Sequence, residues 1–253
     1  MPPQPPADTP DLQLHCLWGD RLATAQEGAQ ALLAFLAALA PHCPPGSSWH
    51  TLGRRNELTL LPADADGCRL VALQPGNGSK RGVPPEATFP AVGFHTLLVT
   101  AGGDQACALH LTQGMQGPHA HNELTLRFPQ QGAAAQAWLT PERMDALLAQ
   151  AIACWQPDLA CVFHTDMRDM DVGYPLPLYW YAYCRRWPDD LGERLGELTY
   201  GAKVWPAAVA PGQVVRSTPE RYDRRIPDHQ AASEALKARL KGLGLLPPPS
   251  PFL

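Results

Sequence analysis

Residues 92–112 read VGFHTLLVT-AGGD-QACALHLT. The two outer parts combine β-branched, aromatic and apolar residues in the manner typical of β-strands. The central residues 101–104 contain two glycines and an aspartate, which favour a tight turn. The stretch therefore predicts an antiparallel hairpin with strands at 92–100 and 105–112.

Further stretches on both sides of this hairpin show the same strand signals, bounded by turn residues. They are 12–17, 56–61, 69–74, 122–128, 159–164, 177–184 and 202–205. A short echo between 56–60 and 122–126, both Asn-Glu-Leu-Thr-Leu, is compatible with related lobes but does not establish a repeat.

Three stretches with apolar residues at helical spacing predict helices: 25–40, 141–156 and 228–241. Thr24 and Glu27 form a capping-box pattern before the first helix. Thr140 and Pro141 have the residue types preferred at the start of the second. Because strands dominate the middle of the chain and the helices are far apart, we expect an α+β fold. Its core would be a mostly antiparallel sheet with about three flanking helices, possibly in two tightly packed lobes.

The chain has 253 residues, 45% of them hydrophobic, which is enough apolar material for a sizeable core. Proline-rich sequence marks both ends, and proline-rich ends without apolar periodicity are typical of disorder. We therefore expect a disordered N-terminus at 1–10, a single α+β domain at 11–245 and a proline-rich tail at 246–253. An adaptor that docks through these ends is one alternative function.

The net charge of −4 is unevenly distributed. Residues 216–241 carry seven basic and four acidic side chains, so this segment is +3 and the rest of the chain is −7. A weakly acidic chain without a basic stripe argues against direct binding of nucleic acid. It would instead attract a protein partner with a basic surface.

The seven cysteines are odd in number and form no Cys-x-x-Cys motif, which favours buried free thiols in a reducing compartment. The N-terminus lacks the charged and apolar regions of a secretory signal. No stretch approaches the roughly 20 apolar residues that span a bilayer. We therefore expect a cytoplasmic protein without a membrane partner.

Two groups of side chains are candidates for a metal-binding or catalytic site. His119 and His121 form a His-x-His pair, which binds zinc in some proteins, although solvent-facing loop histidines are the commoner case. The stretch after the strand at 159–164 contains His164, Asp166 and Asp169, which suit Mg²⁺ binding or acid–base chemistry. A metal-dependent hydrolase built from these residues is a second alternative function.

Other chemical motifs are weak. The glycine-rich residues 74–82 do not match a phosphate-binding loop, because Lys80 precedes the last glycine. No nucleophile elbow, His-Glu-x-x-His or dinucleotide-binding motif occurs, and we predict no cofactor. These observations favour a binding protein over an enzyme.

Aromatic residues are concentrated between 174 and 187, where Tyr and Trp are the types enriched at protein interfaces. Strand alternation would place Tyr179, Tyr181 and Tyr183 on one face and Trp180 on the other. One face could then pack the core while the other remains available to a partner.

Five segments in a characteristic order carry a family resemblance. They are LWGDR at 17–21 before an Ala-rich helix, Trp49, NELTL at 122–126, WQPDLA at 155–160 and VGYPL at 172–176. This order, over roughly residues 14–220, resembles the immunity protein 52 family of bacterial polymorphic toxin systems. The first helix has Ala29-Gln30-Ala31 where the family pattern has an arginine, and the chain after 225 is extended.

The resemblance implies a non-enzymatic antidote with an α+β fold. It also implies a cognate protein toxin, typically a nuclease of restriction-endonuclease fold, delivered by contact-dependent or type VI secretion. From charge and position we expect the toxin to contact Asp166, Asp169 and Asp171, with Tyr174 as an anchor. The oligomeric state is left open by the sequence.

Overall fold

The computed structural model describes residues 12–43, 47–52, 57–76, 82–100, 106–118, 120–129, 135, 138–164, 178–198, 201–208 and 210–246. Its strands are β1 (Leu12–Trp18), β2 (Trp49–Leu52), β3 (Leu58–Leu60), β4 (Gln74–Pro75), β5 (Phe94–Thr100), β6 (Ala108–Gln113), β7 (Asn122–Arg127), β8 (Leu159–His164), β9 (Tyr181–Cys184), β10 (Lys203–Pro206) and β11 (Gln213–Arg216). The helices are α1 (Ala25–Leu39), α2 (Ala65–Ala72), α4 (Pro141–Trp155), α5 (Leu191–Leu195) and α6 (Pro227–Gly242), with a short 3-10 turn at Ala40–His42.

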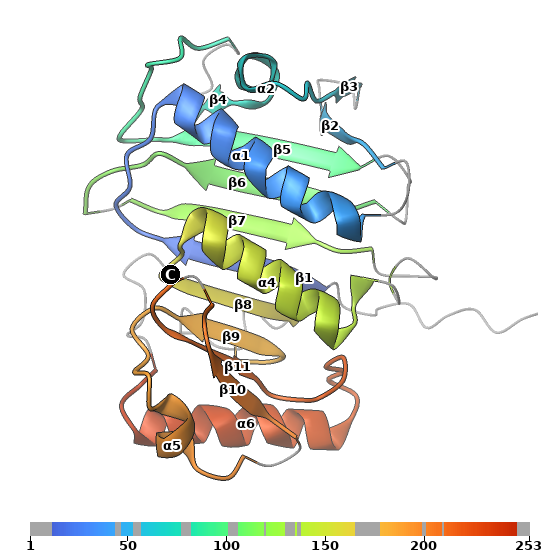
Figure 1. The fold of residues 1–253 in the computed structure, drawn as a ribbon, viewed down its shortest axis with the longest axis vertical. Coiled ribbons are helices and arrows are strands. Elements are labelled where there is room, and N and C mark those ends of the chain that lie inside the picture. Colours follow the sequence, from blue (N-terminus) through green and yellow to red (C-terminus); the bar gives the residue numbers. More distant parts are fainter. Residues whose placement is uncertain are drawn as a thin grey trace, which may run out of the picture.

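One antiparallel sheet contains all of these strands (Figure 1). Its order is β10-β11-β9-β8-β1-β7-β6-β5-β2-β3, and β4 pairs with β5. The predicted pairing of the two hairpin strands is confirmed, because β5 pairs antiparallel with β6 from Phe94–Gln113 to Val99–Ala108. The turn predicted at 101–104 lies outside the described residues. β1 lies between β7 and β8, so strands distant in the sequence form the middle of the sheet. The α+β fold is therefore as predicted, with a large open sheet.

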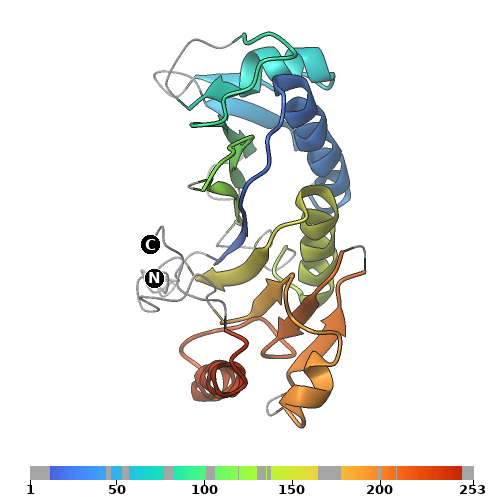
Figure 2. The same ribbon diagram turned by 90° about the vertical axis from the view of Figure 1, so that its left-hand side faces the viewer.

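Two long helices, α1 and α4, cover one face of the sheet (Figures 1 and 2). Thr24 and Glu27 form the predicted capping box of α1, and Thr140 accepts from the Arg143 amide at the start of α4. Beneath these helices runs a row of paired, buried apolar residues: Leu98, Leu109, Leu126, Leu14 and Val162. This face forms the main core, because every second strand residue points into it.

The last helix, α6, lies on the opposite side of the sheet from α4, beside the β9–β11 end (Figure 2). Ala232, Leu236 and Leu240 are its buried apolar residues. The Ser233 hydroxyl donates to the Leu178 carbonyl, and the Trp187 indole donates to the Leu245 carbonyl at 2.9 Å. Both faces of the sheet are therefore covered at the end formed by β9, β10 and β11.

Because both faces of the sheet are covered here, the expectation that one face of the aromatic segment stays available to a partner was wrong. Tyr179, Trp180, Tyr181, Tyr183 and Trp187 are all buried, whichever face they point to. The aromatic side chains pack the protein's own core on both sides, and none of these five is available to a partner.

Two further local predictions were wrong or incomplete. Residues 69–74 do not form a strand: α2 begins after Asp64, which caps the Gly67 amide, and leaves only Gln74–Pro75 extended. The prediction of about three helices missed α2 and α5, and the strands β2 and β11 were not predicted. These elements are short, so they show little periodicity of their own.

All seven cysteines are free, as predicted, and five of them are buried. Burial raises the pKa of the Cys16 thiol and raises that of Cys107 to about 12, so both stay protonated. In the described part of the chain, no helix has the length and apolar character needed to cross a membrane.

Candidate interaction surface

The face of the sheet opposite α1 and α4 is polar over β5, β6 and β7. We call this region the open face and define it by His95, Leu97, His110, Glu123 and Thr125, all on one side by strand register. His95, Thr112 and Glu123 form one cross-strand row, and Leu97, His110, Thr125 and His15 form the next. Paired residues of antiparallel strands point to the same side. Polar residues of four strands, β5, β6, β7 and β1, therefore lie together on the open face.

Glu123 is the centre of this region. Its carboxylate lies 3.4 Å from Nε2 of His121, 3.5 Å from Nδ1 of His110 and 3.9 Å from Nε2 of His15. The Glu123 side chain is 17% exposed, whereas those of His110 and His121 are 42% and 37% exposed. A largely buried carboxylate is thus flanked by two imidazoles that reach the solvent, those of His110 and His121, and by the buried ring of His15.

The neighbouring side chains tie this cluster to the sheet. The Thr125 hydroxyl lies 2.9 Å from Nδ1 of His15, and the Thr112 hydroxyl lies 3.3 Å from Nδ1 of His95. The ring centroids of His95 and His110 are 6.1 Å apart. Four histidines from different segments therefore lie around a single carboxylate.

The electrostatics of the cluster favour an ionised carboxylate. Contact with His110, and then with His121, holds the pKa of Glu123 well below its usual range, against the opposing effect of burial. Burial, and then the neighbouring His110, lower the pKa of His95. The cluster consequently holds an ionised carboxylate among imidazole rings.

Exposed leucines extend the open face toward the edge of the sheet. Leu97 is 44% exposed, and Leu58 and Leu60 on the terminal strand β3 are 49% and 60% exposed. By register, Leu60 is paired with His50 and His50 with Val99, so these side chains share the side of Leu97. Within the described residues no further strand pairs with the outer side of β3. An exposed apolar edge of this kind is typical of an interaction site.

The residues predicted to contact a toxin cannot be placed on this surface. Asp166, Asp169, Asp171 and Tyr174 lie outside the described residues, as does His119. Their role stays a prediction.

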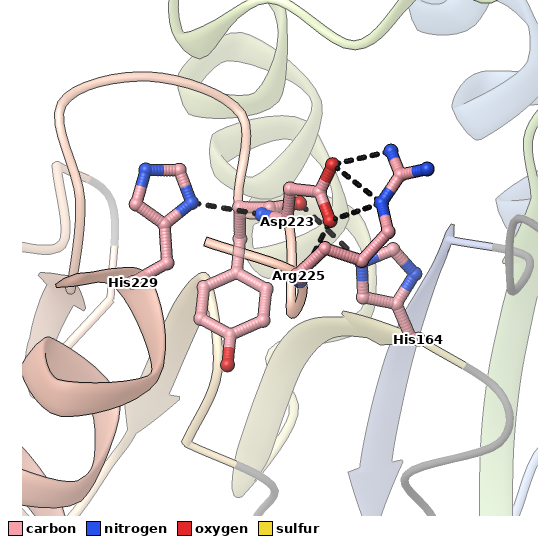
Figure 3. A network of polar contacts seen from close by, with 5 residues as sticks. His164, Asp223, Arg225 and His229 are labelled. Carbon is pink, nitrogen blue, oxygen red and sulfur yellow. Dashed lines mark hydrogen bonds and ion pairs between the residues drawn. The ribbon is translucent and has the colours of Figure 1, made fainter. Parts of the chain in front are cut away.

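His164, the histidine of the hydrolase hypothesis, is buried at the end of β8 (Figure 3). Its Nε2 lies 3.3 Å from the Tyr222 carbonyl. Nearby, Arg225 forms a bidentate ion pair with Asp223, and this pairing lowers the pKa of Asp223 to about 2. His164 therefore supports the segment that leads into α6.

His229 completes this network from the start of α6 (Figure 3). Its Nδ1 accepts from the Asp223 amide at 2.9 Å, so the proton is on Nε2, which donates to Glu220 at 2.9 Å. Both ring nitrogens are occupied, which leaves no lone pair for a general base. The His229–Glu220 pair therefore serves the fold and is not a catalytic dyad.

The hydrolase hypothesis also joined His164 with His121, and this part of it was wrong. Leu12 of β1 pairs with His164, whereas Trp18 at the other end of β1 pairs with Asn122. At about 3.3 Å per strand residue, the two histidines are roughly 20 Å apart along the sheet. They cannot share a metal ion. No three His, Cys, Asp or Glu side chains in the described residues are arranged to hold one.

Sequence reasoning missed the Glu123 cluster. The alternation in 108–112 and in 122–126 already places His110 and Glu123 on the polar sides of their strands. What alternation does not give is the register that sets His110 and Glu123 side by side.

The comparisons with known proteins bear on the fold. No protein-family profile and no curated protein sequence matches the chain, so the resemblance to the immunity protein 52 family stays a prediction. Among solved structures, the Pseudomonas aeruginosa T6SS protein PA0821 is similar, with a TM-score of 0.50 and 13% sequence identity. The similarity covers 92% of this chain and 72% of that one. It extends over nearly the whole chain and, at this identity, establishes a similar fold.

Proposed function

We propose that this chain is an immunity protein of a type VI secretion system (T6SS), which binds and neutralises a cognate toxin and performs no catalysis. The observation that carries the binding role is the open face. There, Leu97 is exposed beside the Glu123 cluster, and Leu58 and Leu60 are exposed at the nearby edge of the sheet, while α1 and α4 bury the opposite face. Apolar side chains clustered on a polar surface are typical of sites that a partner covers.

The secretion context is supported by the structural neighbour, whose name places it in a T6SS. The neighbour and the order of sequence motifs are independent kinds of similarity. Both favour a role in bacterial competition, with the chain acting in the cytoplasm of the cell that it protects.

The partner that we propose is a nuclease, as the family resemblance implies. A nuclease presents a basic groove to its substrate, and the chain outside residues 216–241 carries a net charge of −7. Complementary charge accelerates association and helps to select the partner. An antidote also needs high affinity. Nanomolar binding corresponds to about −12 kcal/mol and usually to an interface of about 1,600 Å².

The acidic loop remains part of this proposal. Replacing Asp166, Asp169 and Asp171 together by alanine should slow association with the toxin and weaken its dependence on salt. Stopped-flow association rates at two salt concentrations measure both effects. Unchanged rates would remove this loop from the interface.

The function is tested with the secreted protein encoded beside this chain's gene. Expressing its C-terminal domain alone should arrest growth, and coexpression with this chain should restore it. The two proteins should also copurify in a one-to-one complex. If growth is not restored and no complex forms, the proposed function is wrong.

A further inference from the structure

We propose that a second copy of this chain pairs with the outer side of β3, so that the sheet of one copy continues into the sheet of the other. β3 ends the described sheet on this side and consists of Leu58, Thr59 and Leu60 (Figure 1). The dimer is independent of the proposed function, and it can be tested on the purified chain alone.

The outward backbone groups of β3 fit an extended chain. The Leu61 amide donates to the Trp49 carbonyl at 2.9 Å, so Leu61 turns its N–H and C=O toward β2. These groups alternate in direction along a strand of an antiparallel sheet. Leu58 and Leu60 therefore turn theirs to the outer side, where the described residues place no other strand. A further strand presents donors and acceptors at the matching spacing.

The opposite edge of the sheet, β10, is built differently. The Ala207 amide donates toward β11, to the Gly212 carbonyl, so by the same alternation the outward groups of β10 belong to Val204 and Pro206. Pro206 has no N–H to donate, and Lys203 adds a charge to this strand. Proline and lysine are residues that commonly prevent pairing between sheet edges. β3, which reads Leu-Thr-Leu, has neither of them.

The sequence of β3 is complementary to itself. When two copies pair antiparallel about Thr59, Leu58 of each copy lies opposite Leu60 of the other, and each such pair exchanges both of its hydrogen bonds. The leucine side chains of both copies then meet on the side of the open face, because paired residues point to the same side. Thr59 meets its own copy on the side of α1. Glu57 falls opposite Leu61, so no like charges meet.

Pairing through β3 gives an assembly that stops at two copies. Both copies use the same edge, related by a two-fold axis, and Pro206 opposes further growth at the β10 edge. The exposed side chains of Leu58 and Leu60, 49% and 60% exposed in one copy, gain apolar contacts across the axis. The open faces of the two copies lie on the same side of the joined sheet, so they form one larger surface.

Sedimentation velocity of the purified full chain measures this association. Wild type should pass reversibly from monomer to dimer between about 5 and about 500 µM, because a short edge strand gives a small, weak interface. Leu60→Lys, which puts a charge on the edge, should raise the dissociation constant at least about tenfold. Leu243→Lys changes another exposed leucine, at the end of α6, and is the matched control that should dimerise like wild type.

Disulfide cross-linking tests the register of the dimer. Thr59 faces its own copy as a pair without hydrogen bonds, in which the Cα atoms lie about 4.5 Å apart, within the range that a disulfide spans. Thr59→Cys should therefore give a cross-linked dimer under mild oxidation, and mass spectrometry should find the bond between the two copies of residue 59. Glu57→Cys places its two thiols about 13 Å apart along the strands and should give at most about a tenth of that yield. Adding Leu60→Lys to Thr59→Cys should remove most of the cross-link.

Three outcomes would overturn the proposed dimer. One is wild type that stays monomeric at the highest concentration; if Leu60→Lys then also abolishes toxin binding, the edge belongs to the toxin. Another is a dimer that Leu60→Lys weakens no more than Leu243→Lys does, with all variants folded by circular dichroism. The third is a cross-link that forms as readily from Glu57→Cys as from Thr59→Cys. None of these measurements depends on whether the chain neutralises a toxin.

Discussion

The Tyr181 hydroxyl on β9 donates a hydrogen bond of 2.7 Å to the carboxylate of Asp145 on α4. Arg216 on β11 donates to the same hydroxyl at 3.3 Å and lies 3.5 Å from Asp145. Its guanidinium is 6.0 Å from the Tyr181 ring centre and 5.9 Å from that of Trp205, within cation–π range. These groups connect α4 to the last strands of the sheet. Burial, and then the bond to Asp145, raise the pKa of Tyr181, so the phenol stays protonated.

Tyr181→Phe should therefore destabilise the chain by about 1–2 kcal/mol, because it leaves the buried Arg216 without this acceptor. Urea unfolding followed by fluorescence measures the change. Asp145→Asn keeps an acceptor for the phenol but removes the charge beside the buried Arg216, so it should also destabilise the chain. Equal stability of Tyr181→Phe and wild type would show that the phenol contributes nothing.

Two glycines should respond to alanine in opposite directions. Gly212, before β11, has φ of 104°, and an added Cβ would lie 2.4 Å from the Cys184 carbonyl oxygen. Gly212→Ala should cost about 2 kcal/mol or more, because the strained backbone and the contact both oppose it. Gly242, the last residue of α6, has no atom within 4 Å of an added Cβ. Gly242→Ala should add about 0.4–1 kcal/mol.

Thermal unfolding of the two glycine variants in parallel checks this pair. A lower midpoint for Gly242→Ala, or an unchanged midpoint for Gly212→Ala, would contradict the backbone geometry described for these positions.

The elements that could be predicted from the sequence carry strong local signals. The capping box of Thr24 and Glu27 and the Thr140-Pro141 pair located α1 and α4 to within about a residue. The strand predicted at 69–74 was wrong because α2 is short, and its apolar residues fit a strand pattern equally well. Asp64, three residues before Gly67, was the cap that could have corrected this.

The thiols should react in two classes. Cys43 and Cys154 are only partly buried, whereas the other five are buried. An aromatic disulfide reagent should therefore modify Cys43 and Cys154 first in the native chain, and all seven in urea. Mass spectrometry of partly labelled protein identifies the sites. Early labelling of Cys16 would contradict its position in the core, where burial raises its pKa.

Glu123 should stabilise the fold in a pH-dependent manner. Its pKa is lowered in the folded chain from an ordinary value of 4.5, first by His110 and then by His121. The stabilisation that this shift reports is complete above pH 4.5 and is lost as the pH falls toward the folded-state pKa. The stability difference between wild type and Glu123→Gln should therefore shrink from pH 5 to pH 3.

Urea unfolding at intervals between those two pH values measures this difference, with Glu193→Gln as the exposed control. A difference that stays constant across the range would mean that the histidines do not hold the carboxylate ionised.

The candidate site was less predictable than the fold. Alternation identifies His110 and Glu123 as outward residues, yet β6 and β7 are joined by a connection whose length does not fix their register. His15 comes from β1, more than a hundred residues earlier, and no local pattern links it to Glu123. Long-range pairing of strands, rather than any motif, assembles this cluster.

The central claim is that the chain works as a complementary surface for a toxin. The most direct measurement titrates the purified chain into the toxin domain encoded beside it, while toxin activity and complex formation are followed together. We predict that activity falls linearly to zero at one equivalent, with a dissociation constant in the nanomolar range or below. Full toxin activity at a large excess of this chain would contradict the claim.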